Sequence, residues 1–181
     1  MQNVLLSDCD LLVEPLATNK TPLSVWIGGV NSQSAIMEMI QYLLKEKASF
    51  LSENISVLKS SSFIPQDTNI SISNIYVLLP MSPESISLHE DINTYIETEL
   101  QVLKTMKEGE VAIVPDAYKN YKTNAYIIPY TDEKHLASHF GIDTQKVSFK
   151  HAFLVDALLA MSIEKILFDK IDYEKINAFE V

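Results

Sequence analysis

The chain contains 181 residues, of which 47% are hydrophobic and 21% charged, so it has the composition of one folded domain and not that of a disordered or collagen-like chain. Its formal net charge is −10, and all 14 basic residues are lysine. Because arginine is the preferred side chain for bidentate contacts with phosphate and guanine, this composition argues against a nucleic-acid partner.

The cysteine count and the lengths of the apolar runs indicate the cellular compartment in which the protein is expected. Cys9 is the single cysteine, so neither an internal disulfide nor a zinc site built on thiolates can form, which indicates a reducing compartment. The N-terminus lacks a basic stretch followed by a long apolar run, and no window is long enough for a membrane helix. We therefore expect a cytoplasmic protein without membrane insertion.

The first half of the chain predicts strands and one clear helix. Apolar runs bounded by turn-forming residues predict strands at 10–17, 23–29, 55–59 and 70–79. Between them, residues 31–47 carry apolar side chains at helical spacing, with Asn31 or Ser32 as a cap.

The middle of the chain predicts a long helix followed by a hairpin. Ser82 and Pro83 begin a helix whose apolar face continues to Gly109. Residues 110–115 and 123–129 then predict two strands that pair as a hairpin around a turn rich in tyrosine and lysine.

The last third repeats the alternation of helices and strands. A helix is expected from 131 to 140, starting at Thr131 and ending at a Gly141 cap. The remaining expectations are a strand at 146–149, an apolar helix at 152–161, a strand at 165–169 and a final extended segment, NAFEV. The whole pattern predicts an α+β fold, with a mixed sheet packed by about four helices, as one compact domain over residues 1–181.

Part of the last third resembles a known family. The stretch YIIPYTDEKHLASHFG contains a strand running into a Pro-x-aromatic-Thr turn that opens a helix, at Pro129, Tyr130 and Thr131, and an apolar helix and KILFDKIDYEKINAF follow. In these features, residues 110–181 resemble the enhanced-serine-sensitivity (SseB-type) family. That resemblance implies a compact α+β domain of the kind found in bacterial proteins linked to secretion or toxin systems, without an established catalytic motif.

Gly28 and Gly29 lie between a predicted strand and a predicted helix, where backbone amides can hold an anion. A Rossmann fingerprint needs three spaced glycines, and a P-loop needs Gly-Lys-Ser or Gly-Lys-Thr. The segment WIGGVNSQSA contains neither, so a tight turn with a helix cap is the favoured interpretation.

Two histidines offer a metal-binding alternative. His135 and His139 stand four residues apart on one predicted helix, the spacing of two metal ligands on a single helix face. No HExxH motif surrounds them, so two exposed histidines without metal are the favoured interpretation, and we predict no cofactor.

No catalytic constellation is recognisable. No serine occurs in a GxSxG motif, Cys9 has acidic neighbours that disfavour its thiolate, and the carboxylates are scattered singly. We therefore identify no catalytic residue and lean against an enzyme.

Tyrosines crowd the segment from 115 to 130. Tyr126 and Tyr130 lie in or beside an apolar strand, as Trp26 does, and are candidates for the core, whereas Tyr118 and Tyr121 in the turn are candidates for a protein interface. The sequence predicts a cytoplasmic protein-interaction module, of immunity, chaperone or secretion-adaptor type, without catalytic activity. Its expected partner is a protein, for which a basic surface would complement the acidic chain. The alternatives are an enzyme with a site dispersed in the sequence and a metal or small-ligand sensor that uses His135 and His139.

Overall fold

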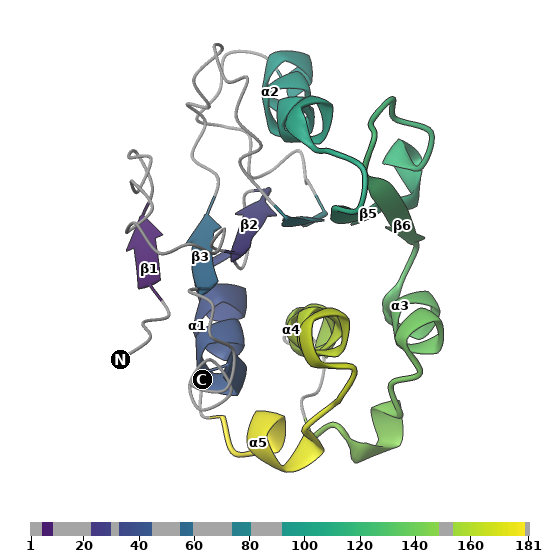
Figure 1. The fold of residues 1–181 in the computed structure, drawn as a ribbon. Helices are drawn as coiled ribbons and strands as arrows, with labels where there is room; N and C mark the ends of the chain where they lie inside the picture. The colour runs from purple at the N-terminus through teal and green to yellow at the C-terminus, as the bar shows by residue number, and fades with distance from the viewer. Residues whose placement is uncertain are drawn as a thin grey trace.

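The fold is that of a layered sheet with helices on both faces (Figure 1). It is seen in a computed structural model that describes residues 5–8, 23–29, 33–44, 55–59, 74–80, 92–148 and 154–179.

Among the described residues, six strands form one sheet, and every strand pair in it is parallel. The strands are β1 (Leu5–Asp8), β2 (Leu23–Gly28), β3 (Ile55–Lys59), β4 (Ile75–Leu78), β5 (Val111–Pro115) and β6 (Tyr126–Tyr130). The four residues of β4 are all buried, which is the usual condition of a central strand in a parallel sheet covered on both faces.

The strand order is β1-β3-β2-β4-β5-β6, so the direction of winding changes at β2. From β2 the chain passes through helix α1 (Gln33–Leu44) to β3 on one side, and it later enters β4 on the other side of β2. The carboxyl ends of β2 and β4 therefore flank a topological switch point, the usual location of ligand sites in open parallel sheets.

Helices cover the two faces unequally. One face carries α1, α3 (Glu133–Phe140) and α4 (Leu154–Phe168), with the short α5 (Tyr173–Asn177) closing the end of that layer. The other face carries α2 (Ile92–Thr105), which packs on β4. Figure 1 shows α2 on the opposite side of the sheet from α1 and α4.

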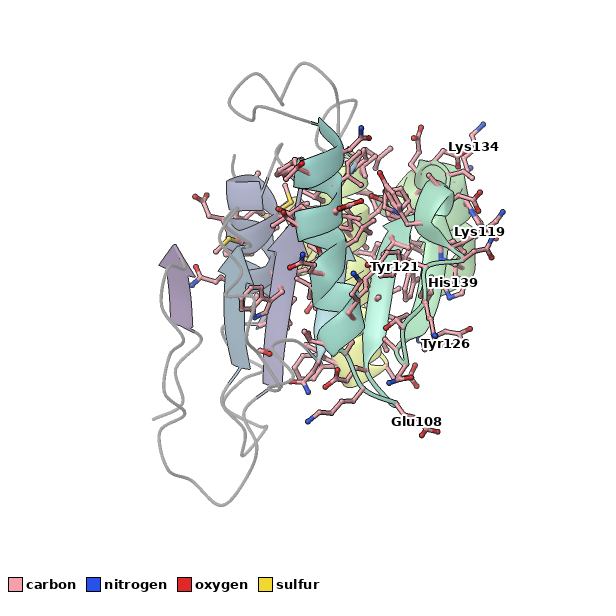
Figure 2. All side chains as sticks on the ribbon, turned by 90° about the horizontal axis from the view of Figure 1, so that it is seen from above. Glu108, Lys119, Tyr121, Tyr126, Lys134 and His139 are labelled. Carbon is pink, nitrogen blue, oxygen red and sulfur yellow. The ribbon has the colours of Figure 1, made fainter. Side chains whose placement is uncertain are left out.

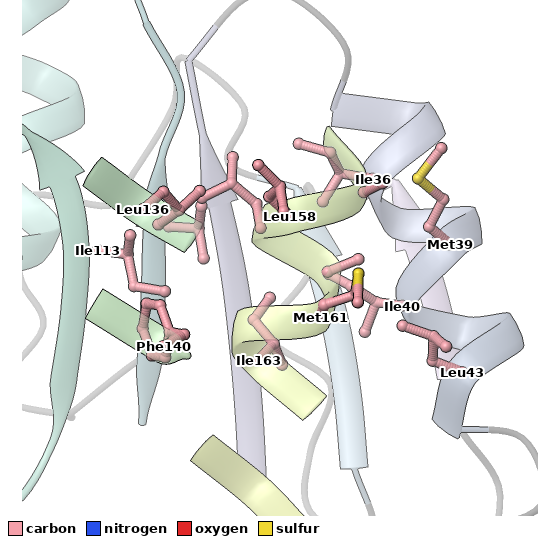
Figure 3. Packing of buried hydrophobic residues seen from close by; sticks show 14 of the residues in the cluster. Ile36, Met39, Ile40, Leu43, Ile113, Leu136, Phe140, Leu158, Met161 and Ile163 are labelled. Atoms are coloured by element: carbon pink, nitrogen blue, oxygen red, sulfur yellow. The ribbon is translucent and has the colours of Figure 1, made fainter. Parts of the chain in front are cut away.

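The described part of the chain contains two hydrophobic clusters, and the larger one lies between the sheet and the layer formed by α1, α3 and α4. Figure 3 shows α4 residues such as Leu158 and Met161 between the apolar side of α1 and the Leu136 and Phe140 side of α3. The smaller cluster, between the sheet and α2, contains Trp26 and Tyr76. The predicted single compact domain of helices and strands is confirmed, as is the core position of Trp26.

The hairpin prediction for 110–115 and 123–129 was wrong. The strands β5 and β6 lie side by side but run parallel, with Val111 opposite Tyr126 and Pro115 opposite Tyr130. The connection, which contains the 3₁₀ turn Asp116–Tyr118, returns the chain to the start of β5 before β6 begins. Apolar alternation identifies a strand but carries no information on its direction.

The predicted strand at 165–169 was also wrong, because α4 continues through Phe168. A short apolar run fits a buried helix as well as a strand, and here Lys165 pairs with Asp169 at 2.6 Å, a spacing of one helical turn. Asp169 then takes a positive φ of 52° and ends the helix.

Smaller differences concern the segments around α3 and α5. The helix predicted from 131 to 140 is α3, but its cap is Asp132, which accepts a hydrogen bond from the His135 amide, and Gly141 ends it with a φ of 66° as expected. Val147 and Ser148 are not in a strand, and Asn177 ends α5 where an extended segment was predicted. The predicted strand at 10–17 and the start of the predicted helix at Ser82 lie outside the described residues.

Candidate functional site

The candidate site is the edge of the sheet where β2 and β4 end. Gly28 is the last residue of β2, and Gly29 follows it. The amide of Leu79 donates a hydrogen bond to the carbonyl of Gly28 at 3.0 Å, which holds the two strand ends together. Gly29 has a φ of 99°, and a Cβ placed there would lie 2.8 Å from the Cβ of Leu79. Both the backbone conformation and the close approach of Leu79, the residue after β4, therefore require glycine at this position.

Beneath Gly28 lies a buried polar group that sequence reasoning missed. The Tyr76 hydroxyl donates to the backbone carbonyl of Glu99 at 2.9 Å and to its carboxylate Oε2 at 3.2 Å. The Glu99 side chain comes from α2, and it is only 1% exposed. Tyr95, one helical turn earlier on α2, is hydrogen-bonded to the same carboxylate.

The environment of these tyrosines keeps them neutral. Burial, followed by the nearby Glu99 charge, raises the pKa of Tyr76 well above its ordinary value, and the same causes raise the pKa of Tyr95. Both hydroxyls therefore remain hydrogen-bond donors to the carboxylate at neutral pH.

A second buried pair lies at the same sheet edge but on the opposite face. Tyr130, at the end of β6, donates its hydroxyl to the carbonyl of Leu78 at the end of β4, at 2.9 Å. Burial and the nearby charge of Asp156 raise the pKa of Tyr130. Asp156 lies in the first turn of α4 and is 4% exposed. Polar side chains from α2 and α4 thus approach the switch point from both faces.

The other residues singled out in the sequence are not brought together at this edge. Tyr118 and Tyr121 are half-buried and pack against the smaller cluster beneath α2. Tyr130 is in the core, as expected, but Tyr126 is 64% exposed (Figure 2). The candidate anion-binding residues Asn31 and Ser32, and Cys9, lie outside the described residues.

His135 and His139 are both exposed on α3. The His135 ring lies 3.4 Å from the Thr131 hydroxyl, and the His139 ring contacts Phe140 edge to face. Across the described part of the chain, no three His, Cys, Asp or Glu side chains are grouped so that they could hold a metal ion. No helix in that part is long and apolar enough to cross a membrane.

Comparison with known proteins shows which proteins this chain is similar to. No protein-family model matches the chain. The chain is 42% identical over 171 residues to a protein of Campylobacter jejuni strain 81-176, and 41% identical over the same length to that of C. jejuni strain 81116. Both are named UDP-N-acetylmuramoylalanine–D-glutamate ligase. A Helicobacter pylori protein of strain J99 with the same name is 26% identical over 177 residues.

The matches cover most of this chain but less than half of each C. jejuni relative. Each C. jejuni match covers 87% of this chain but 42% of the relative, so the chain spans less than half the length of the curated relatives it matches. Because the match leaves few residues of this chain unaligned, it includes most of residues 110–181, the part that resembles the SseB-type family.

These matches overturn the prediction of a non-catalytic protein-interaction module, since the relatives are enzymes. The description of the chain as an SseB-like, protein-binding component is corrected for the same reason. Motif reading failed here because it tests a few short patterns, whereas the similarity to ligases is spread over the whole match.

The buried group under Gly28 had one weak signal in the sequence. On the predicted helix, Glu99 stands four residues after Tyr95 and four before Leu103, and therefore on the side expected to face the core. A carboxylate in such a position needs hydrogen-bond donors, but the sequence does not reveal that Tyr76 supplies one.

Proposed function

We propose that this protein takes part in joining D-glutamate to UDP-N-acetylmuramoylalanine, the reaction named for its relatives. The observation that supports this proposal is the 42% identity over 171 residues, which extends over 87% of the chain. The parallel sheet with a glycine-lined switch point at the ends of β2 and β4 is compatible with it, because such edges commonly hold the ligands of α/β enzymes.

The chemistry of the reaction sets requirements for the complete enzyme. Formation of an amide from a free carboxylate and an amine is unfavourable in water, so a ligase couples it to cleavage of a nucleoside triphosphate. Two substrates and the nucleotide must therefore be held together. Since the chain spans 42% of its relatives' length, we propose that further sequence or a second polypeptide contributes part of this binding.

Location and surface contacts follow as parts of the same proposal. A nucleotide-linked substrate is a cytoplasmic metabolite, which favours the cytoplasm as the site of action. Tyr118 and Tyr121 keep part of their surface accessible beside the exposed Lys119, and this patch is a proposed contact for such a second polypeptide.

The test is the metabolite pool in the native cells. Depletion of this protein should raise the ratio of UDP-N-acetylmuramoylalanine to its D-glutamyl product, measured by liquid chromatography and mass spectrometry, by about tenfold or more. Re-expression of the unchanged protein should restore the ratio. An unchanged ratio after verified depletion would contradict the proposed reaction.

A purified reaction provides the second measurement. The protein is incubated with UDP-N-acetylmuramoylalanine, ATP, magnesium and either D-glutamate or L-glutamate, with and without a cell extract from the depleted strain. Product that forms only with D-glutamate, and only when the protein is added to the extract, supports the proposal. Equal product with and without the added protein contradicts it.

A further inference from the structure

The segment 104–125 differs in charge from the rest of the chain. It contains four lysines and three acidic residues, whereas the remaining residues contain ten lysines and 21 acidic residues. Two of its three carboxylates are engaged within the segment. Glu110 is buried and accepts a hydrogen bond from a backbone amide at 2.6 Å, and Asp116 forms an ion pair with Lys119 at 3.1 Å. With Glu108 as its one other carboxylate, the segment is locally basic on a protein with a net charge of −10.

Three lysines of this segment, all exposed, lie around the end of α2. Lys104 is in the last turn of the helix, and Lys107 follows the helix by two residues. Lys122 belongs to the connection between β5 and β6, and the side chain of its neighbour Thr123 donates a hydrogen bond to the carbonyl of Leu103 on α2. Within the part of the chain that the structure describes, none of these three ammonium groups forms an ion pair.

Two tyrosines place aromatic surface in the same connection. The rings of Tyr118 and Tyr121 are half-buried and pack against the hydrophobic cluster beneath α2. A backbone hydrogen bond of 3.0 Å from the Tyr121 amide to the Tyr118 carbonyl folds this part of the connection into a tight turn. Tyrosine is enriched at protein interfaces, because a fixed ring buries a large area and loses little conformational entropy on binding.

The end of α2 lies on the other side of the sheet from the candidate site. The helix follows β4 and precedes β5, so its last turn is near the amino edge of the sheet, where β5 starts. Gly28 and Gly29 are at the carboxyl edge. A partner bound at the end of α2 therefore leaves the candidate site accessible.

We infer that this surface binds an acidic segment of a second polypeptide through the following residues: Lys104, Lys107, Lys122, Tyr118 and Tyr121. Carboxylates brought to three ammonium groups that have no ion pair within the described residues gain Coulomb energy and speed association, and the tyrosines add apolar contact. Because the chain has no arginine, a polypeptide is a better match for the surface than a nucleic-acid backbone. The partner is taken to be the second polypeptide of the proposed function, on which this inference rests. The net charge of the chain favoured a basic partner surface, and the local charge at the end of α2 favours an acidic one.

Photo-crosslinking in the native cells measures what lies against this surface. A photoreactive phenylalanine analogue replaces Lys104 or Lys122, and as a control Lys134, which is exposed on α3 at the opposite face of the sheet. Crosslinked peptides are identified by mass spectrometry. We expect positions 104 and 122 to crosslink to a segment of one polypeptide in which aspartate and glutamate outnumber lysine and arginine, and position 134 not to do so. Crosslinks to nucleic acid, crosslinks to a basic segment, or no crosslink at positions 104 and 122 would overturn the inference.

Charge reversal tests whether the lysines hold the crosslinked partner. Lys104→Glu/Lys122→Glu should reduce the amount of that partner recovered with the tagged 181-residue protein about tenfold or more. Lys134→Glu/Lys170→Glu changes the net charge equally at two exposed lysines, on α3 and just after α4, and should leave the recovery unchanged. Equal recovery with the two double variants would overturn the inference. Circular dichroism melting is recorded for each variant, and if Lys104→Glu/Lys122→Glu does not fold, Lys104→Gln/Lys122→Gln takes its place.

The acidic contact and the proposed reaction can fail separately. Crosslinking and recovery identify the partner by contact and not by product. An unchanged ratio of UDP-N-acetylmuramoylalanine to its D-glutamyl product, with crosslinks to an acidic segment, would refute the proposed reaction alone. A changed ratio without such crosslinks would refute the acidic contact alone.

Discussion

The Tyr130 hydroxyl donates to the backbone carbonyl of Leu78, 52 residues earlier, and so links the end of the edge strand β6 to the end of the central strand β4 across β5. Strand pairing alone does not connect these two strands, because β5 lies between them. The contact therefore stabilises the same sheet edge that contains Gly28 and Gly29.

Tyr130→Phe should lower the free energy of unfolding by about 1 to 2 kcal/mol, because it leaves the carbonyl of Leu78 without this buried donor. Urea denaturation measures the change. Tyr126→Phe on the same strand is the control. Because Tyr126 is 64% exposed, water can satisfy any group that loses its hydroxyl as a hydrogen-bond partner. Equal effects of the two substitutions would show that the Tyr130 hydrogen bond adds nothing to stability.

Gly28→Ala should destabilise the protein by about 2 to 4 kcal/mol, because the new methyl group would overlap the Tyr76 hydroxyl and the Glu99 carboxylate. Gly109→Ala is a matched control: Gly109 has a positive φ of 89° but no atom within 4 Å of the added carbon, so only backbone strain of about 1 kcal/mol is expected. A Gly28→Ala protein as stable as the parent would rule out the close packing beneath β2.

Tyr118→Glu and Tyr121→Glu should each reduce stability by about 1 to 3 kcal/mol, because both rings pack against the cluster beneath α2. Thermal unfolding compares them with Lys119→Glu, an exposed neighbour that should have little effect. If both variants have the melting temperature of the parent protein, the two rings are not needed for stability, and the proposal that they contact a second polypeptide gains support.

Acid should weaken the start of α3 through Asp132. The His135 amide donates a hydrogen bond to this carboxylate and holds the pKa of Asp132 below its ordinary value. A carboxyl group with a lowered folded-state pKa stabilises the fold above its unfolded-state pKa, and the contribution disappears as the pH falls through the folded-state pKa. The parent protein should therefore lose more stability than Asp132→Asn between about pH 6 and pH 2, as recorded by melting temperature. Parallel curves for the two proteins would contradict this role.

Local sequence features were sufficient to predict the helices that are marked by capping residues or by a regular helical spacing of apolar residues. The helix α3 was predicted because Asp132, Glu133 and Gly141 mark its two ends by short-range backbone chemistry. The helix α1 was predicted because its apolar residues repeat with helical spacing and form one buried face.

Local sequence features did not predict the type or direction of elements that depend on packing against segments far away in the sequence. Residues 165–168 are helical because α4 is enclosed by α1, α3 and the sheet. The strand β6 runs parallel to β5 because its connection crosses back to the start of that strand. Each outcome depends on which segment packs alongside, and hydrophobic periodicity contains no information on that choice.

The amino-acid sequence by itself determined the composition, the positions of the capped helices, the absence of a P-loop lysine near Gly28, and, through similarity over most of its length, the relation to ligases. Only the tertiary structure brought Tyr76, Tyr95 and Glu99 together beneath Gly28, and Tyr130 against the carbonyl of Leu78. The physical reason is that caps and helical spacing depend on neighbours within a few residues. A buried carboxylate is tolerated only when donors from other elements reach it, and chain topology decides which donors do so.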